Sequence, residues 1–157
     1  MPLVFRHILF PTDFSDLALS ALVFAQGMAE RFEAQLHCLY VVDEAYQYWS
    51  GMGPESIPVG PPAEDLLALG RARMDKFREE QLSGLAKPAI TQVAIGRPFA
   101  EIIAYGRENG IDLIVLGTHG RGGLAHVLLG STAEKVVRKA TCAVLTVRAG
   151  GSDFEMP

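Results

Sequence analysis

Short apolar runs and longer segments of helical periodicity alternate along this 157-residue chain, and this alternation limits the fold more than any other feature. Most of the short runs are apolar throughout, which is typical of parallel strands covered by helices on both faces. The change from strand to helix and back occurs four times, as in α/β proteins. We therefore expect one doubly wound parallel sheet of five strands, with helices on both faces.

The boundaries of the expected elements follow from turn and capping residues. Strands are expected at 7–10, 34–42, 89–95, 111–116 and Ala143–Val147, and helices at 15–32, 63–83, 98–109 and from 131 onward. Pro11 is expected to end the first strand. Ser15 is a predicted N-cap, and Ser131 with Glu134 forms a predicted capping box. Residues 1–148 would form the domain, with a long loop at 43–62 that is rich in glycine and proline, and 149–157 a flexible tail.

Charge and hydropathy exclude several classes of partner. The formal net charge is −4 and the basic residues are scattered, which argues against binding of nucleic acid. No apolar stretch reaches the roughly 18 residues of a membrane span, and the N-terminus lacks a secretory pattern. His7, His37 and His126 are too widely spread in the sequence to indicate a metal site. We expect a soluble, cytoplasmic protein that binds neither membrane nor nucleic acid.

Two strand ends carry the residues that suit a ligand, because open parallel sheets bind ligands beyond the carboxyl ends of their strands. The first end is Pro11, Thr12 and Asp13, and the second is Gly117, Thr118, His119, Gly120, Arg121 and Gly122. Glycines allow successive backbone N–H groups to point at one anion. Gly130, Ser131 and Thr132 then open a helix, whose N-terminus favours a phosphate. Together these segments predict a phosphate site.

Several of these residues have a second interpretation. Asp13 is a ligand group at the strand end or a capping carboxylate near Ser15, and Ser131 contacts a phosphate or only caps its helix. His119 is expected to orient the loop or touch a phosphate, since no Ser or Asp partner is positioned to make it a catalyst. Arg121 neutralises phosphate charge or is a solvated loop residue. A phospho-acceptor role as in receiver domains is excluded, because such a site needs an acidic pair after the first strand and a phospho-acceptor after the third, where Ile95, Gly96 and Arg97 offer none.

The spacing of the glycines resembles that of one known family. Gly117, Gly120, Gly130 and Ser131 follow the pattern Gly, two residues, Gly, nine residues, Gly, Ser, without the lysine of a Walker loop. In this respect the chain resembles the universal stress protein family of the nucleotide-binding type. The resemblance covers nearly the whole chain, and only residues 43–62 and the tail lack a counterpart.

This resemblance implies a sheet order of 3-2-1-4-5 and a role for each site residue. Asp13, with Pro11 and Thr12, would face the ribose, and the backbone of Val41 would meet the edge of the adenine. Residues 117–122 and 130–132 would wrap the phosphates of ATP, ADP or AMP, with or without Mg²⁺ or Mn²⁺. The resemblance also implies a homodimer formed through the last strand, Ala143–Val147.

Three functions remain open from the sequence. The first is a homodimeric sensor or regulator of the stress response that binds ATP. The second is a slow ATPase or phosphotransferase that uses the same site, to which Asp13 and Arg121 would contribute. The third is an interaction protein that binds no nucleotide, against which the intact glycine spacing argues. Hydrolysis needs an oriented water and a base, and no dedicated base is evident. We therefore expect at most weak ATP hydrolysis.

Overall fold

The computed structural model describes residues 2–45, 61–118 and 129–148. In chain order its elements are β1 (His7–Thr12), α1 (Asp16–Phe32), β2 (Gln35–Asp43), α3 (Ala63–Phe77), η1 (Arg78–Leu82), β3 (Ile90–Gly96), α4 (Pro98–Glu108), β4 (Leu113–Gly117), α5 (Ser131–Lys139) and β5 (Ala143–Val147). The η1 segment is a turn of π-helix that continues α3.

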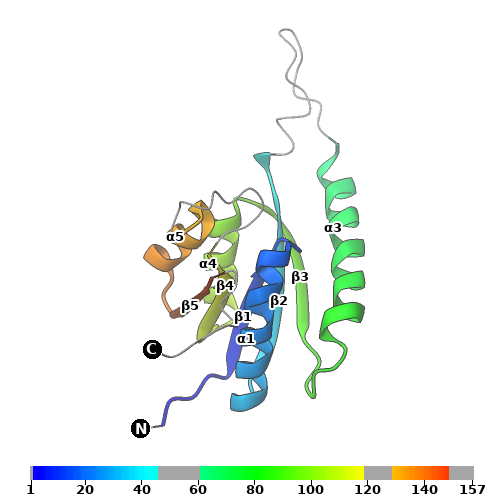
Figure 1. The fold of residues 1–157 in the computed structure, drawn as a ribbon. Helices are drawn as coiled ribbons and strands as arrows, with labels where there is room; N and C mark the ends of the chain where they lie inside the picture. Colours follow the sequence, from blue (N-terminus) through cyan, green and yellow to red (C-terminus); the bar gives the residue numbers. More distant parts are fainter. Residues whose placement is uncertain (1, 46–60, 119–128, 149–157) are drawn as a thin grey trace.

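The five strands form one parallel sheet in the order β3-β2-β1-β4-β5, which confirms the predicted fold and strand order. The carboxyl ends of the strands point to the top of Figure 1, and the N-terminus lies at the bottom. The chain moves outward from β1 to β3 and then crosses back to β4. The switch point of the sheet therefore lies between β1 and β4.

Each face of the sheet has its own core, because successive strand residues point to opposite faces. In β1, the buried side chains of Ile8 and Phe10 pack in the core under α1 and α3. The side chain of Leu9 lies between them in sequence and packs on the other face with Ile102 of α4 and Val136 of α5. Burial on both faces explains why the strands are apolar throughout.

The first helix begins and ends as its sequence predicts. Ser15 is the N-cap of α1, and its Oγ accepts a hydrogen bond from the N–H of Ala18 at 3.2 Å. The apolar stripe of α1 is buried, with Ala21 and Ala25 fully inaccessible to solvent. Glu33 ends the helix in the left-handed conformation, at φ 53°.

The prediction that Pro11 ends the first strand was wrong. β1 continues to Thr12, and Pro11 pairs with Leu39 of β2. Proline is tolerated in strands mainly at edges, where its missing N–H breaks no ladder bond. The last pair between β1 and β4 is at Leu9, so the β4 side of β1 is an open edge at Pro11.

The predicted capping box at the start of the last helix was also wrong. Gly130 is the N-cap, with an extended backbone at φ −67° and ψ 160°, and Ser131 is the first helical residue. Glu134 is thereby one position too far along the helix to complete the box. Its carboxylate pairs instead with Arg138, one turn later, at 3.1 Å. Because Gly130 takes the cap position, the helix starts one residue earlier than it would with Ser131 as its cap.

Candidate functional site

The sheet opens at its switch point, toward the carboxyl ends of the strands. Over the described strands, β1 and β4 pair at two positions, the second of which joins Leu9 to Ile114. The pairing of β1 with β2 continues to Thr12, and the pairing of β4 with β5 continues to Gly117. The two halves of the sheet therefore separate beyond Leu9 and Ile114. Such a crevice is where open α/β sheets hold their ligands.

The far wall of this crevice joins the end of β4 to the start of α5. The N–H of Thr118 donates to the carbonyl of Val147 at 2.9 Å, which continues the ladder with β5. The carbonyl of Thr118 accepts a hydrogen bond from the N–H of Gly130. The side chain of Thr118 is 4% exposed, so this junction is buried. Thr118 and Gly130, which are twelve residues apart in sequence, are thus direct neighbours at the end of the sheet.

The N-terminus of α5 lies at this junction and has the properties of an anion site. Ser131 and Thr132 are the first two helical residues, and their N–H groups belong to the turn that a helix leaves without internal partners. Among the described residues, no side chain caps this end. Unbonded N–H groups and the positive end of the helix dipole both favour a negative charge. Ser131 is exposed and Thr132 half-buried, so both remain accessible.

The near wall is a tight turn that holds Asp13. Its Oδ1 accepts hydrogen bonds from the N–H of Ser15 at 3.0 Å and from the Ser15 hydroxyl at 2.5 Å. The hydroxyl of Thr12 accepts the N–H of Phe14 at 3.0 Å. Phe14 is left-handed, at φ 62°, a conformation that non-glycine residues adopt rarely. Asp13 therefore orients the N-cap of α1, which is the capping role that the sequence left open. Its role toward a ligand stays a prediction.

An aromatic cluster beside this turn was missed from the sequence. The ring centroids of Phe14 and Tyr40 lie 4.6 Å apart, and the guanidinium of Arg73 lies 4.9 Å from the centroid of Phe14. A guanidinium over an aromatic face is attracted by the ring quadrupole. Arg73 belongs to α3, so this contact fixes α3 against the ends of β1 and β2. The expected pairing of β1 with β2 could have predicted this cluster, because it brings Phe14 and Tyr40 together near the carboxyl ends of these strands.

The other predicted site residues divide into two groups. Val41 is half-buried on β2 and pairs with Ala94 of β3. It directly follows Tyr40, the residue of β2 that pairs with Thr12. Gly117 is the last residue of β4. The remaining four lie outside the described residues: His119, Gly120, Arg121 and Gly122. Within the residues that the structure describes, no group of three or more His, Cys, Asp or Glu side chains is arranged to hold a metal ion.

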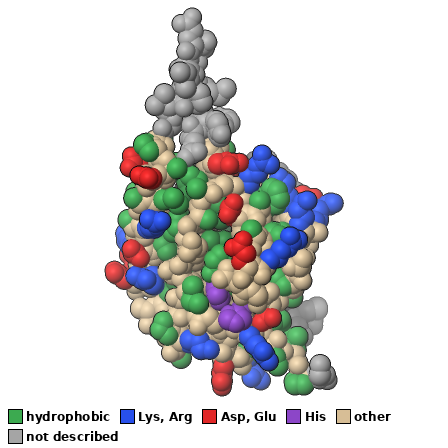
Figure 2. Space-filling view, turned by 180° about the vertical axis from the view of Figure 1, so that it is seen from behind, with side chains coloured by type: hydrophobic (Ala, Val, Ile, Leu, Met, Phe, Trp, Pro, Cys, Tyr) green, Lys and Arg blue, Asp and Glu red, His purple; other side chains and the backbone are tan. Residues whose placement is uncertain are grey.

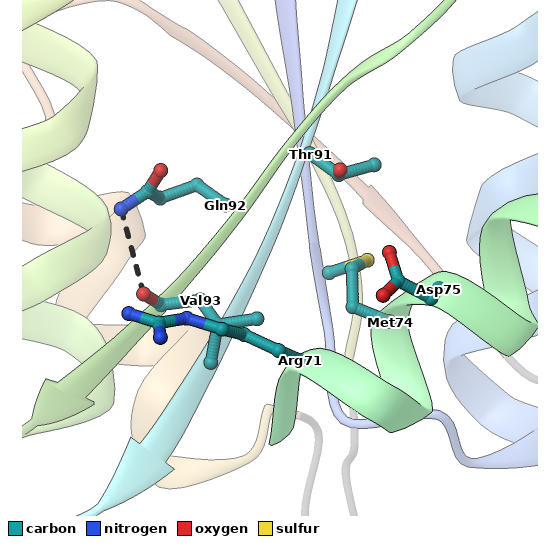
Figure 3. Close-up of a pocket in the computed structure, with 6 residues that line it drawn as sticks. All are labelled: Arg71, Met74, Asp75, Thr91, Gln92 and Val93. Carbon is teal, nitrogen blue, oxygen red and sulfur yellow. Dashed lines mark hydrogen bonds between the residues drawn. The ribbon is translucent and has the colours of Figure 1, made fainter. Parts of the chain in front are cut away.

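A separate pocket of about 260 Å³ lies between α3 and β3, at the edge of the sheet (Figure 3). Its walls are Arg71, Met74 and Asp75 of α3 and Thr91, Gln92 and Val93 of β3. The amide of Gln92 donates to the carbonyl of Val93 at 3.4 Å, drawn as a dashed line in Figure 3. None of the predicted site residues lines this pocket. Because the described residues of the predicted site lie at the carboxyl ends of β1 and β4, the crevice between these strands is the better candidate.

Comparison with known proteins identifies the family. The model of the Universal stress protein family matches residues 5–148. The chain belongs to the universal stress protein family. Universal stress protein MJ0531 of Methanocaldococcus jannaschii is 35% identical over 152 residues, which cover 92% of this chain and 83% of that protein. The resemblance predicted from the glycine spacing is therefore confirmed.

Solved structures of the family share the fold. Universal stress protein UspA from Lactobacillus plantarum matches with a TM-score of 0.73 at 30% identity and covers 94% of this chain and 100% of its own. A universal stress protein in complex with cAMP matches with a TM-score of 0.62 at 23% identity and covers 92% of this chain and 98% of its own. At that identity the second likeness is one of fold alone. Among the described residues of the present chain, no helix has the length and apolar character needed to cross a membrane.

Proposed function

We propose that this universal stress protein binds an adenine nucleotide in the crevice between β1 and β4. The observation that carries the proposal is the bond between Thr118 and Gly130, which holds a helix N-terminus beside the open end of β4. Phosphates would bind the N–H groups of residues 130–132 and of the glycine segment 117–122. The cAMP complex supports the proposal as an analogy of fold, because the same architecture holds an adenine nucleotide in that protein.

The near wall would hold the nucleoside. Pro11, Thr12 and Asp13 would lie along the ribose, with the carboxylate of Asp13 accepting hydrogen bonds from the ribose hydroxyls. The backbone of Val41 would meet the adenine edge. ATP, ADP and AMP share these groups, and Mg²⁺ or Mn²⁺ would bind through the phosphates, as divalent ions usually do with nucleotides. We infer a regulatory rather than an enzymatic role, exercised by a cytoplasmic homodimer.

Substitution of Gly130, with a matched substitution of Gly84 as the control, tests the phosphate site. Gly130→Val should abolish binding of ATP in isothermal titration calorimetry, because its side chain would crowd the phosphate path at the start of α5. Gly84→Val is the matched control, since Gly84 is exposed and nothing lies within 4 Å of a Cβ built there. Both variants should keep the wild-type circular dichroism spectrum. Unchanged affinity in Gly130→Val would refute the phosphate assignment.

Two substitutions of Asp13 separate its capping role from its proposed ligand role. Asp13→Asn keeps an oxygen for the two bonds from Ser15 but removes the charge, whereas Asp13→Ala removes both. A hydrogen bond to a charged group contributes about 1.5–3 kcal/mol, so both variants should lose roughly 10- to 150-fold in ATP affinity. Only the alanine variant should also lose appreciable thermal stability. Wild-type affinity in Asp13→Asn would assign Asp13 to capping alone.

The homodimer is proposed to form through β5, an edge strand of the sheet. Its unpaired backbone edge is a template for pairing with a second copy. Ala143 of β5 and Ile90 of β3 are both exposed, and they lie on opposite edges. Ala143→Lys should give monomers in sedimentation velocity, because the symmetric contact would bring two like charges together. Ile90→Lys should leave the dimer intact. A dimer that survives only Ala143→Lys would place the contact at β3.

A further inference from the structure

Three side chains form a hydrogen-bonded series near the amino ends of the strands, at the opposite end of the sheet from the candidate site. Nδ1 of His7 and Nε2 of His37 lie 3.1 Å apart, and Nδ1 of His37 lies 2.9 Å from the hydroxyl of Tyr105. His37 is 3% exposed, whereas His7 is half-buried. The histidines lie side by side on the face that Figure 2 shows. The three side chains thus link β1, β2 and α4, with the buried His37 between two half-buried partners.

The two imidazoles are arranged as hydrogen-bond partners and not as ligands of one metal. Their ring centroids lie 5.3 Å apart, close to the greatest separation that a 3.1 Å contact between two ring nitrogens permits. The nitrogens therefore point almost directly at each other. Two ligands of a shared metal would point at a common apex beside the line that joins them. Among the described residues no third metal ligand joins the pair.

The protonation state of His7 and His37 decides whether these hydrogen bonds can form. While the pair carries at most one positive charge, one of the two facing nitrogens holds a hydrogen and the other accepts it, and Nδ1 of His37 bonds to the hydroxyl of Tyr105. Both bonds are then made. When both rings are positively charged, both facing nitrogens carry hydrogen, and neither can accept. The rings must then move apart, although His37 is enclosed.

The surroundings of these three side chains supply few groups that would stabilise a second positive charge on the histidines. On β2, the buried thiol of Cys38 lies near Tyr105, and burial raises the pKa of both groups. Asp112 precedes β4, and its carboxylate accepts the backbone N–H groups of Arg6 and His7. Burial and the charge of His7 together lower the pKa of His37. The carboxylate of Asp112 thus lies beside His7, at one end of the three linked side chains.

We propose that His7, His37 and Tyr105 form a proton-responsive latch, closed while the two histidines together carry at most one positive charge and opened when both are protonated to imidazolium. Opening releases the last turn of α4 from the amino ends of β1 and β2. Gly117 and the N-terminus of α5 lie at the other end of the strands, so the latch does not depend on nucleotide binding.

Native-state hydrogen exchange of the full-length protein between pH 7 and pH 4 tests the latch. After correction for the intrinsic effect of pH, amides of residues 102–108 and 35–38 should exchange about tenfold faster for each unit by which pH falls, the slope for uptake of one proton. His37→Gln should remove this slope, because glutamine takes up no proton. Arg107→Gln, on the exposed side of the same helical turn, is the control and should keep it.

Histidine NMR provides a second readout in the wild type and in His7→Gln, which remains informative if His37→Gln fails to fold. In His7→Gln the His37 signal should titrate at higher pH than in the wild type, because the charge of His7 is removed. Tyr105→Phe should change the titration of His37 and leave the fold unchanged. Equal acid slopes in the wild type and His37→Gln, or an unshifted His37 titration in His7→Gln, would overturn the proposal.

Discussion

Two glycines in helices should respond in opposite ways to the same substitution. Gly27 lies exposed in the interior of α1, and nothing lies within 4 Å of a Cβ built there. Alanine loses less conformational freedom than glycine on folding, which stabilises an open helical site by about 0.5–1 kcal/mol. A Cβ on Gly70 of α3 would lie 2.9 Å from Cγ1 of Val93 and 3.3 Å from side-chain atoms of Tyr40 and Val42.

A Cβ at Gly70 would be so close to Val93 that neighbouring atoms would have to move, at a cost in free energy. Val93 is β-branched and stiff at χ1, and the other two side chains close the remaining directions. Overpacking costs about 1–3 kcal/mol, from which the same helical gain of up to 1 kcal/mol is subtracted. Gly70→Ala should therefore destabilise the protein by roughly 0.5–2 kcal/mol. The lower end applies if β3, an edge strand, moves outward.

Urea unfolding of both variants measures this difference directly. The midpoint should rise in Gly27→Ala and fall in Gly70→Ala, with the slope unchanged, because the surface exposed on unfolding is the same. In thermal unfolding each kcal/mol corresponds to a shift of about 2–4 °C for a chain of this size. If Gly70→Ala were as stabilising as Gly27→Ala, the close packing of α3 on β2 and β3 would be wrong.

Two further predictions concern single polar residues. Ser15→Ala should lower the free energy of unfolding by about 1 kcal/mol, because the N–H of Ala18 loses its cap. Ser20→Ala, at a half-buried position inside the same helix, should change the urea midpoint little. Burial alone would raise the pKa of Asp112, but backbone hydrogen bonds from Arg6 and His7 and their positive charges lower it. The unfolded chain then binds the proton more readily, so this contribution to stability is present at neutral pH and is lost as pH falls below about 4. Asp112→Asn should be less stable than the wild type at pH 7 in urea unfolding, and the difference should shrink in acid; a constant difference would contradict the assignment.

The sequence predicted the features that depend on local pattern. The apolar stripe of α1 and the cap at Ser15 follow from residues within one helix, and the strand order follows from the family resemblance. The start of α5 was misplaced by one residue because serine usually outranks glycine as a cap, while the bond from Gly130 to Thr118 favours the glycine. That bond joins residues on different elements, and local propensity carries no information about it.

Long-range contacts account for the rest of what sequence analysis missed. His7 and His37 are 30 residues apart, and Tyr105 follows 68 residues after His37. Their spacing gave no sign of contact, and only the register of β1 on β2 brings the two histidines together. The opening of the sheet beyond Leu9 likewise depends on how two strands diverge, although the switch point itself was predictable from strand order.

Equilibrium binding of ATP to the purified protein tests the central claim most directly. Nucleotide carried through purification is first removed by denaturation and refolding, and the released material is identified by chromatography. Calorimetry with ATP and Mg²⁺ should then give saturable binding of one nucleotide per chain, with a Kd below about 1 mM, and no phosphate release above that of buffer. Absence of both released nucleotide and saturable binding would contradict the nucleotide site.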